Sequence, residues 1–176
     1  MAILKLESVP TDAKAAAIRL GGNFHVLATR PVQAGEVIMR IEGELTRRPD
    51  RHTLQVGPDL HLEVPPEASL ELILDRYFWR FLNHSCRPSA FIRDREVVAL
   101  RRLRPWDEVS FDYDCTEWDM AEPFPCRCGS RRCRGLIRGF VHLDRAHRRR
   151  LRPWVAPWML DLGEAGGSPD SVRTTA

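Results

Sequence analysis

The sequence predicts a mostly β domain with minor helix, built from several small sheets. Short runs of strand-forming residues recur over the first two thirds of the chain, and turns containing Gly, Pro or Asp separate them. Only two segments place apolar residues at helical spacing. With 176 residues, 43% hydrophobic and 29% charged, the chain is long enough for a sizeable core and has an ordinary globular composition.

Single strands are expected where apolar and polar residues alternate, or where β-branched and aromatic residues gather. These segments cover residues 3–9, 24–29, 37–41 and 109–113.

Two hairpins are expected from the turns between neighbouring strands. Residues 53–56 and 60–64 flank Gly57-Pro58-Asp59, which is a strong turn sequence. A second pair, residues 90–93 and 97–100, surrounds a two-residue turn and is expected to form another hairpin.

Helix is expected in two places. Residues 70–82 follow Pro65-Pro66, which ends the preceding strand, and residues 141–151 end shortly before Pro153. Residues 163–176 are mostly small and polar, with Pro and Gly, and are expected to be disordered.

The net charge of +3 does not indicate a nucleic-acid partner for the chain as a whole. Arginine runs within residues 101–104, 131–134 and 148–150 are basic enough for an acidic partner. Such runs are more often simply solvated surface.

The N-terminus lacks a basic stretch followed by an apolar run and a cleavage site, and no segment approaches the ~20 apolar residues of a membrane span. We therefore expect no membrane contact and a cytoplasmic, nucleoid or nuclear location rather than secretion. In a reducing compartment, five cysteines favour metal binding over disulfides.

Three of the five cysteines, Cys126, Cys128 and Cys133, lie within eight residues. Thiolates bind Zn2+ tetrahedrally, so three closely spaced cysteines leave one position to be filled from elsewhere in the chain. Gly129 allows a tight turn between them. The sequence therefore predicts a structural zinc site, with Cys86 and Cys115 both open as the fourth ligand.

Four segments, in this order, make the chain resemble a known family. Val26 to Glu36 looks like an opening strand, residues 80–88 read RFLNHSCRP, residues 107–113 read DEVSFDY, and the cysteine cluster is followed by Arg134-Gly135. Together they resemble the SET-domain protein-lysine methyltransferases with their post-SET zinc module. The resemblance covers roughly residues 15–140.

The resemblance implies a fold of small sheets with a pseudoknot, in which the Asn83–Cys86 segment passes beneath a loop near Phe111–Tyr113. It also implies that Cys86 is the fourth zinc ligand. The expected division is an N-terminal strand region (1–14), a SET domain (15–117), a post-SET module (118–140), a C-terminal helix region (141–162) and a disordered tail (163–176).

The family transfers a methyl group from S-adenosylmethionine to a lysine amine. The protein must mainly align the reacting atoms and keep the lysine neutral, which a narrow apolar channel favours by desolvation. The resemblance places the catalytic tyrosine at Tyr113 and a channel residue at Phe111. Because Phe leaves more room than Tyr and lacks a hydroxyl to hold the amine, we expect that more than one methyl group can be added.

The resemblance also assigns cofactor contacts. Asn83 and His84 correspond to the motif that contacts the cofactor, and Phe24 with its neighbours Asn23 and His25 corresponds to the first contacting segment. Leu136 lies just beyond the zinc cluster, where the family commonly covers the adenine.

The sequence departs from the family pattern at several positions. Asn23 and His25 stand where the family usually has Gly-x-Gly, which lets the backbone approach the cofactor closely. Ser89 replaces a usual Asn, and Trp106 replaces a turn glycine. The segment between the first hairpin and Asn83 is short, which implies a shallow groove for the substrate peptide.

Two other functions are open. The first is a SET-like binding module with weak catalysis, because Asn23 and His25 alter the cofactor pocket. The second is a zinc-stabilised nucleic-acid or chromatin adaptor that uses Arg131, Arg132, Arg134 and the arginines at 148–150. For the enzyme we expect a monomer of minimal, bacterial type acting on a histone, a histone-like protein or a ribosomal protein.

Overall fold

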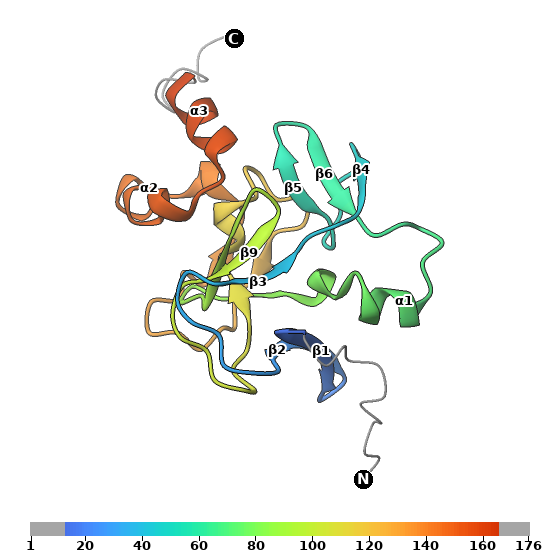
Figure 1. Ribbon diagram of the computed structural model, residues 1–176. Helices are drawn as coiled ribbons and strands as arrows, with labels where there is room; N and C mark the ends of the chain where they lie inside the picture. The colour runs from blue at the N-terminus through green and yellow to red at the C-terminus, as the bar shows by residue number, and fades with distance from the viewer. Residues whose placement is uncertain (1–12, 166–176) are drawn as a thin grey trace.

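Five small β-sheets, none with more than three strands, form the framework of the computed structural model, which describes residues 13–165 (Figure 1). The predicted mostly β fold is therefore confirmed. The strand expected over residues 3–9 and the tail from residue 166 onward lie outside the described residues.

The strands are β1 (Ala15–Leu20), β2 (Asn23–Ala28), β3 (Val37–Arg40), β4 (Glu44–Thr46), β5 (Leu54–Gly57), β6 (Leu60–Glu63), β7 (Asn83–His84), β8 (Ala90–Arg93), β9 (Glu96–Ala99), β10 (Ser110–Phe111), β11 (Phe124–Pro125) and β12 (Leu136–Ile137). They form the sheets β1-β2, β3-β9-β8, β4-β6-β5, β10-β7 and β11-β12.

Both predicted hairpins are confirmed. Strands β5 and β6 pair antiparallel around the Pro58-Asp59 turn, and β8 pairs antiparallel with β9. Asp94 and Arg95 turn that second hairpin with φ of 50° and 62°, the left-handed conformation that a tight two-residue turn requires. Strand β1 was not predicted, because three consecutive alanines have little strand preference and its register comes from pairing with β2.

Strand β7 pairs in parallel with β10, so the Asn-His-Ser-Cys segment lies beside the segment that leads to Tyr113. Ser89 reinforces this pairing. Its buried hydroxyl donates to the Glu108 carbonyl at 2.7 Å and accepts from the Ser110 amide at 2.9 Å. Ser89, which stands where the family usually has Asn, therefore forms a polar bridge between the two segments.

Trp106 occupies a left-handed turn with φ of 73° and is 63% exposed. A non-glycine residue in this region carries a strain of roughly 1 kcal/mol or more. A positive φ favours glycine, which the family usually has here, and in this chain a tryptophan adopts that conformation. Its amide donates to the Ala28 carbonyl at 2.8 Å, which anchors the turn against the end of β2.

The helices are short. They are α1 (Leu70–Asp75), α2 (Arg145–Leu151) and α3 (Pro157–Ala165), with the 3-10 helices η1 (Phe78–Phe81), η2 (Tyr113–Cys115), η3 (Phe140–His142) and η4 (Arg152–Trp154). None of the helices between residues 13 and 165 is both long and apolar enough to cross a membrane.

The two predicted helices are each divided. The helix expected over residues 70–82 ends after α1, because Trp79 turns into the core, where its indole donates to the Glu42 carbonyl at 2.8 Å. The segment 141–151 contains part of η3 and then α2, which begins where the Asp144 side chain caps the His147 amide. The strand expected over residues 109–113 stops at Phe111, because Asp112 caps η2.

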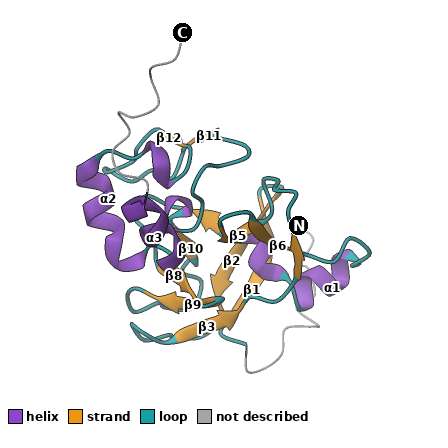
Figure 2. Ribbon diagram, turned by 90° about the horizontal axis from the view of Figure 1, so that it is seen from above, coloured by secondary structure: helices purple, strands orange, loops and turns teal. Residues whose placement is uncertain are grey.

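Two hydrophobic clusters hold these elements together. The larger lies between the small sheets and includes Val26, Leu62, Val97 and Val109, all completely buried. The smaller joins Cys115 to the C-terminal helices, with Met159 buried at its centre. In Figure 2 helices α2 and α3 lie on the side of the molecule opposite α1. The last predicted segment, from residue 163, is thus helical as far as residue 165.

Candidate active site and metal centre

A narrow pocket of about 40 Å3 lies where β10 leads into η2. Its apolar lining comes from segments far apart in the chain: Ile41, Leu54, Trp79, Leu82, Ile92 and Phe111. Its polar and charged lining includes Asp50, Arg51, His52, Arg80, Glu117 and Glu122. Tyr113 also lines this pocket, so the two residues predicted to be catalytic are brought together.

Tyr113 is held from two sides. Its hydroxyl donates to the Leu82 carbonyl at 2.7 Å, and its ring centroid is 4.7 Å from that of Phe111. Burial raises the pKa of Tyr113 well above its usual range, and the neighbouring carboxylate of Glu117 adds to this effect. At neutral pH the side chain is therefore a neutral phenol that can donate a hydrogen bond.

Glu117 places a half-buried carboxyl group in the same pocket. Its amide donates to the Tyr113 carbonyl at 2.9 Å, and its Oε1 accepts from the Gln55 amide at 2.9 Å. Burial raises the pKa of Glu117 to about 7, although the Gln55 hydrogen bond opposes the shift.

A second polar group gathers where β2 meets the start of β7. Asn83 Nδ2 donates to Glu108 Oε1 at 2.9 Å and to the Phe24 carbonyl at 3.3 Å. His25 Nδ1 lies 2.8 Å from the same Glu108 oxygen and 3.2 Å from Asn83 Nδ2. Three residues assigned to the cofactor by resemblance, Phe24, His25 and Asn83, therefore meet around Glu108.

The other residues assigned to the cofactor lie apart from that group. Asn23 is exposed, next to the Gly21-Gly22 turn of the β1-β2 hairpin. Leu136 is 48% exposed and lines a different pocket, beside the cysteine cluster. The ring of Phe24 stacks on Phe81 with centroids 4.3 Å apart.

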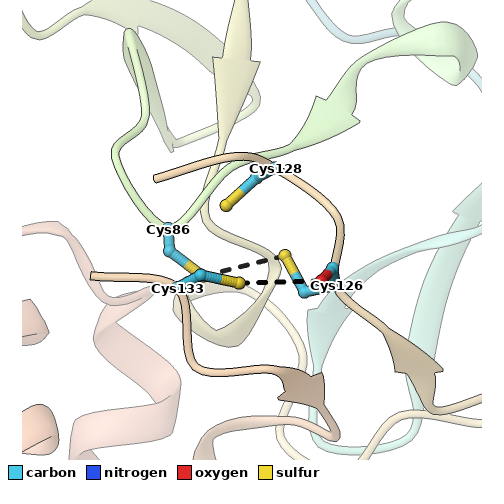
Figure 3. Close-up of side chains that lie close together, drawn as sticks. All are labelled: Cys86, Cys126, Cys128 and Cys133. Atoms are coloured by element: carbon cyan, nitrogen blue, oxygen red, sulfur yellow. Dashed lines mark hydrogen bonds between the residues drawn. The ribbon is translucent and has the colours of Figure 1, made fainter. Parts of the chain in front are cut away.

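The sulfur atoms of Cys86, Cys126, Cys128 and Cys133 all lie within 4.8 Å of one another (Figure 3). A tetrahedral site with Zn–S bonds of ~2.3 Å separates its sulfurs by about 3.8 Å. The Cys86–Cys126 sulfur distance of 3.9 Å agrees with that spacing. The donor set is four thiols, which is the ligand set of a structural zinc site, so these residues can hold Zn2+. We call these four cysteines the metal group.

Cys115 is not part of the group, so the geometry favours Cys86 over Cys115 as the fourth ligand. Its thiol is buried in the smaller hydrophobic cluster, and burial raises its pKa well above the usual range. Within the metal group, burial likewise raises the pKa of Cys86 to about 11, despite the charge of Arg134. Cys128 differs: although burial opposes it, backbone hydrogen bonds lower the pKa of its thiol to about 7.

His84 connects the metal group to Tyr113. Its Nδ1 accepts from the Tyr113 amide at 3.2 Å, so in the neutral ring the proton is on Nε2, which faces the Cys86 sulfur at 3.3 Å. Burial lowers the pKa of His84 to about 4, so the ring is neutral at pH 7, although Asp112 lies nearby. Its side chain is thus directed toward the sulfur group and away from Asn83's partners.

Arg134 forms a buried ion cluster directly beside this link. Its guanidinium donates to both Asp112 oxygens at 2.8 and 2.5 Å and to Asp114 at 2.7 Å. Its backbone amide also donates to the Cys86 sulfur at 3.4 Å. The loop of the cysteine cluster is thereby joined to both residues that flank Tyr113.

Glu108, Glu117 and the pairing of Arg134 with Asp112 were not predicted from the sequence. Glu108 and Asp112 lie inside the DEVSFDY segment, so motif position was an available signal for both. Glu117 follows the motif and contacts Gln55 from a distant hairpin. No local pattern indicated it.

This fold and site define a small-sheet domain that joins a four-cysteine group to a tyrosine pocket. Residues 23–114 match the SET domain family model, which is just over half of the chain. The chain therefore belongs to the SET-domain family. The match ends before Cys126, so the assignment of a post-SET module rests on the cysteine geometry.

Curated relatives agree with this family. The chain is 36% identical over 114 residues to the methyltransferase flvH of Aspergillus flavus. This alignment covers 62% of this chain and 57% of that protein. It is 28% identical over 123 residues to the histone-lysine N-methyltransferase trithorax of Drosophila virilis. That alignment covers 62% of this chain and 3% of that protein. The chain thus spans little more than half of the first relative and a small part of the second.

Solved structures show the same fold. A structure of KRYPTONITE with mCHH DNA, an H3(1-15) peptide and SAH superposes with a TM-score of 0.51, at 20% identity, over 68% of this chain and 28% of that one. A second KRYPTONITE complex, with mCHG DNA and SAH, gives the same TM-score at 19% identity. It covers 67% of this chain and 27% of that one.

Replacing Cys86 tests the metal group. We expect Cys86→Ala to weaken zinc binding more than about 100-fold, because one of four thiolates is lost, and to lower the unfolding temperature. Zinc content per chain and competition with a chelator measure the change. The matched control is Cys115→Ala, which should keep one zinc per chain. Zinc loss from the control, or unchanged zinc in Cys86→Ala, would contradict the assignment.

The raised pKa of Glu117 predicts a pH dependence of stability. Between pH 4.5 and about 7 the unfolded chain has released a proton that the folded chain retains, so stability falls as pH rises through this window. We expect a loss of about 2–3 kcal/mol. The variant Glu117→Gln keeps an acceptor for the Gln55 amide but has no ionisable group, so its stability should not show this fall with pH.

Urea unfolding at pH 5 and pH 8 measures the difference. Glu122→Gln, at an exposed carboxylate on the same pocket, is the control and should follow the wild-type pH dependence. A Glu117→Gln curve parallel to wild type would rule out the perturbed carboxyl group.

Proposed function

We propose that this chain is a protein-lysine methyltransferase that uses S-adenosylmethionine. The observation that carries the proposal is the narrow, partly apolar pocket at which Tyr113 and Phe111 meet. The parallel pairing of β7 with β10 places Asn83, a proposed cofactor residue, beside the strand that ends at Phe111. A site for methyl transfer needs both parts, because the amine and the methyl donor must meet in line.

The residues around Glu108 fit the charged end of S-adenosylmethionine in chemical type. A carboxylate at Glu108 suits an ammonium group, and the Asn83 amide, which donates to Glu108 here, would donate to the cofactor carboxylate by exchanging that partner. When bound, the cofactor would supply a methyl group on a positively charged sulfur, which an amine can displace. The KRYPTONITE structures contain SAH, which supports the same cofactor class here.

The pocket residues would prepare the lysine for reaction. Apolar walls from Leu82, Ile92 and Phe111 disfavour the charged ammonium form and exclude water. Tyr113, kept as a neutral phenol, would orient groups at the inner end of the pocket. Glu117, with a pKa of about 7, would face the incoming amine and is able to accept its proton.

The substrate we propose is a protein with an accessible lysine, of histone or histone-like type. Relatives named as histone-lysine methyltransferases and the H3 peptide in the KRYPTONITE complex support this class. A ribosomal protein is the second substrate to assay. Reduced cysteines in a zinc site fit an intracellular location, in the cytoplasm, nucleoid or nucleus.

The alternative of a SET-like binding module is favoured by one observation. His25 and Asn23 place side chains where the family usually has glycine, and His25 lies against Glu108. In that case the cofactor would bind weakly or not at all. Calorimetric titration with S-adenosylmethionine tests this alternative, because absence of cofactor binding would reject the enzyme.

Labelling tests the enzyme directly. The zinc-loaded protein is incubated with methyl-labelled S-adenosylmethionine and separate samples of histones, ribosomal proteins and cell extract. We expect labelled protein bands, and a loss of at least about 100-fold in rate for Tyr113→Phe, with cofactor affinity within threefold of wild type. Equal labelling by wild type and Tyr113→Phe would reject the proposed role of the tyrosine.

Phe111→Tyr tests the number of methyl groups added. The ring of Phe111 contacts the Tyr113 ring, so an added hydroxyl would narrow the pocket and hold the amine. We expect wild type to give products with more than one methyl group and Phe111→Tyr to give mainly monomethyl product. Mass spectrometry at excess cofactor measures the distribution, and purely monomethyl product from wild type would contradict the prediction.

A further inference from the structure

Positive charge is concentrated in one stretch of this chain. Residues 123–152 contain ten arginines and one carboxylate, Asp144, although the whole chain has a net charge of only +3. The remaining residues are therefore net negative. Such segregation is hidden in the overall composition and requires its own explanation.

The fold uses two of these arginines internally. Arg134 is bound to Asp112 and Asp114, and the guanidinium of Arg148 lies over the Phe140 ring and donates to the Val141 carbonyl. These two are therefore unavailable to a partner, although both were included in the predicted basic surface.

Three other arginines line one open pocket, whose remaining lining comes mainly from the cysteine loop, the segment after it and the start of α2. Arg132, Arg138 and Arg150 take part in none of the ion pairs formed within residues 13–165. In addition, Arg150 Nη2 is buried without a hydrogen-bond partner. We call this pocket, of about 550 Å3, the arginine groove.

The acidic groups of the arginine groove are already engaged. Asp114 accepts from Arg134 and from the Gly139 amide, and Asp144 caps α2 and lies 2.7 Å from His147 Nδ1. The groove therefore presents unpaired positive charge in a concave surface much larger than a single ion needs. The cysteine loop and α2 carry further exposed arginines: Arg127, Arg131, Arg145 and Arg149.

The surface lacks the apolar centre of a protein–protein interface. Among the described residues, the large exposed hydrophobic side chains lie elsewhere, with Leu136 alone bordering the groove. Its lining within the described residues also lacks Phe, Tyr and Trp, on which unpaired bases would stack, and the rings of its two histidines, His142 and His147, are hydrogen-bonded to Asp119 and Asp144. These features favour a regular, extended polyanion, whose phosphates match the planar guanidinium groups.

We propose that the arginine groove binds the phosphate backbone of duplex DNA. Arginines of the cysteine loop and of α2 would each contact phosphates, with Arg132, Arg138 and Arg150 at the centre of the contact. This site is separate from the tyrosine pocket, so the proposal holds whether or not the chain transfers methyl groups. In an enzyme, it would keep the protein close to substrates that are bound to DNA.

Fluorescence anisotropy with a labelled 20-bp duplex of arbitrary sequence tests the proposal on the zinc-loaded chain. Contact with three phosphates predicts that affinity falls about 40-fold when NaCl rises from 50 to 200 mM. We expect the triple variant R132Q/R138Q/R150Q to lose at least tenfold in affinity at 50 mM NaCl and to have a shallower salt dependence.

The matched control removes the same number of charges elsewhere, at the exposed residues Arg30, Arg102 and Arg104, each changed to Gln. It should change affinity less than threefold, and both variants should keep wild-type zinc content and unfolding temperature. Equal losses in the two variants, or no binding of wild type at 50 mM NaCl, would overturn the proposal. The proposal would also be overturned if the chain bound a single-stranded DNA of the same length, or an acidic polypeptide, more tightly than the duplex.

Discussion

The ion cluster of Arg134 with Asp112 and Asp114 is the interaction on which the rest of the site depends. All three side chains are nearly inaccessible to solvent, at 6% for Arg134 and 1% for each carboxylate. Removing one member of such a buried cluster leaves unpaired charge in a poorly solvated place, which typically costs about 3–5 kcal/mol. Because Tyr113 stands between the two carboxylates in sequence, this cluster fixes both ends of the turn that carries the tyrosine.

The same cluster explains why a zinc site would influence a reaction that needs no zinc. Arg134 donates from its backbone to the Cys86 sulfur and from its side chain to Asp112, and His84 joins the same sulfur to the Tyr113 amide. A metal ion held by the four sulfurs would therefore act through position. It would keep the loop closed and the tyrosine turn in place, while the ion itself stays outside the tyrosine pocket.

Local chemistry determined how much could be predicted from the sequence. Turn residues revealed both hairpins, and the cysteine spacing with the Asn-His-Ser-Cys segment revealed the metal group, because these signals need only a few neighbouring residues. The helix expected over residues 70–82 was divided because Trp79 is drawn into the core by a distant carbonyl. Glu117 acquires its environment from Gln55, which lies on another hairpin, so no pattern around Glu117 could disclose it.

The C-terminal helices have a consequence for the size of the folding unit. The family match ends at residue 114, but the turn that begins at Tyr113 continues to Cys115, whose thiol is buried by Phe140, Val155 and Met159. The Ala156 amide donates to the Cys115 carbonyl at 2.8 Å, and Arg93 donates to the Pro153 carbonyl at 2.6 Å. The part of the chain that matches the family model is thus smaller than the packed unit, because the C-terminal helices pack against the end of the turn that carries the tyrosine.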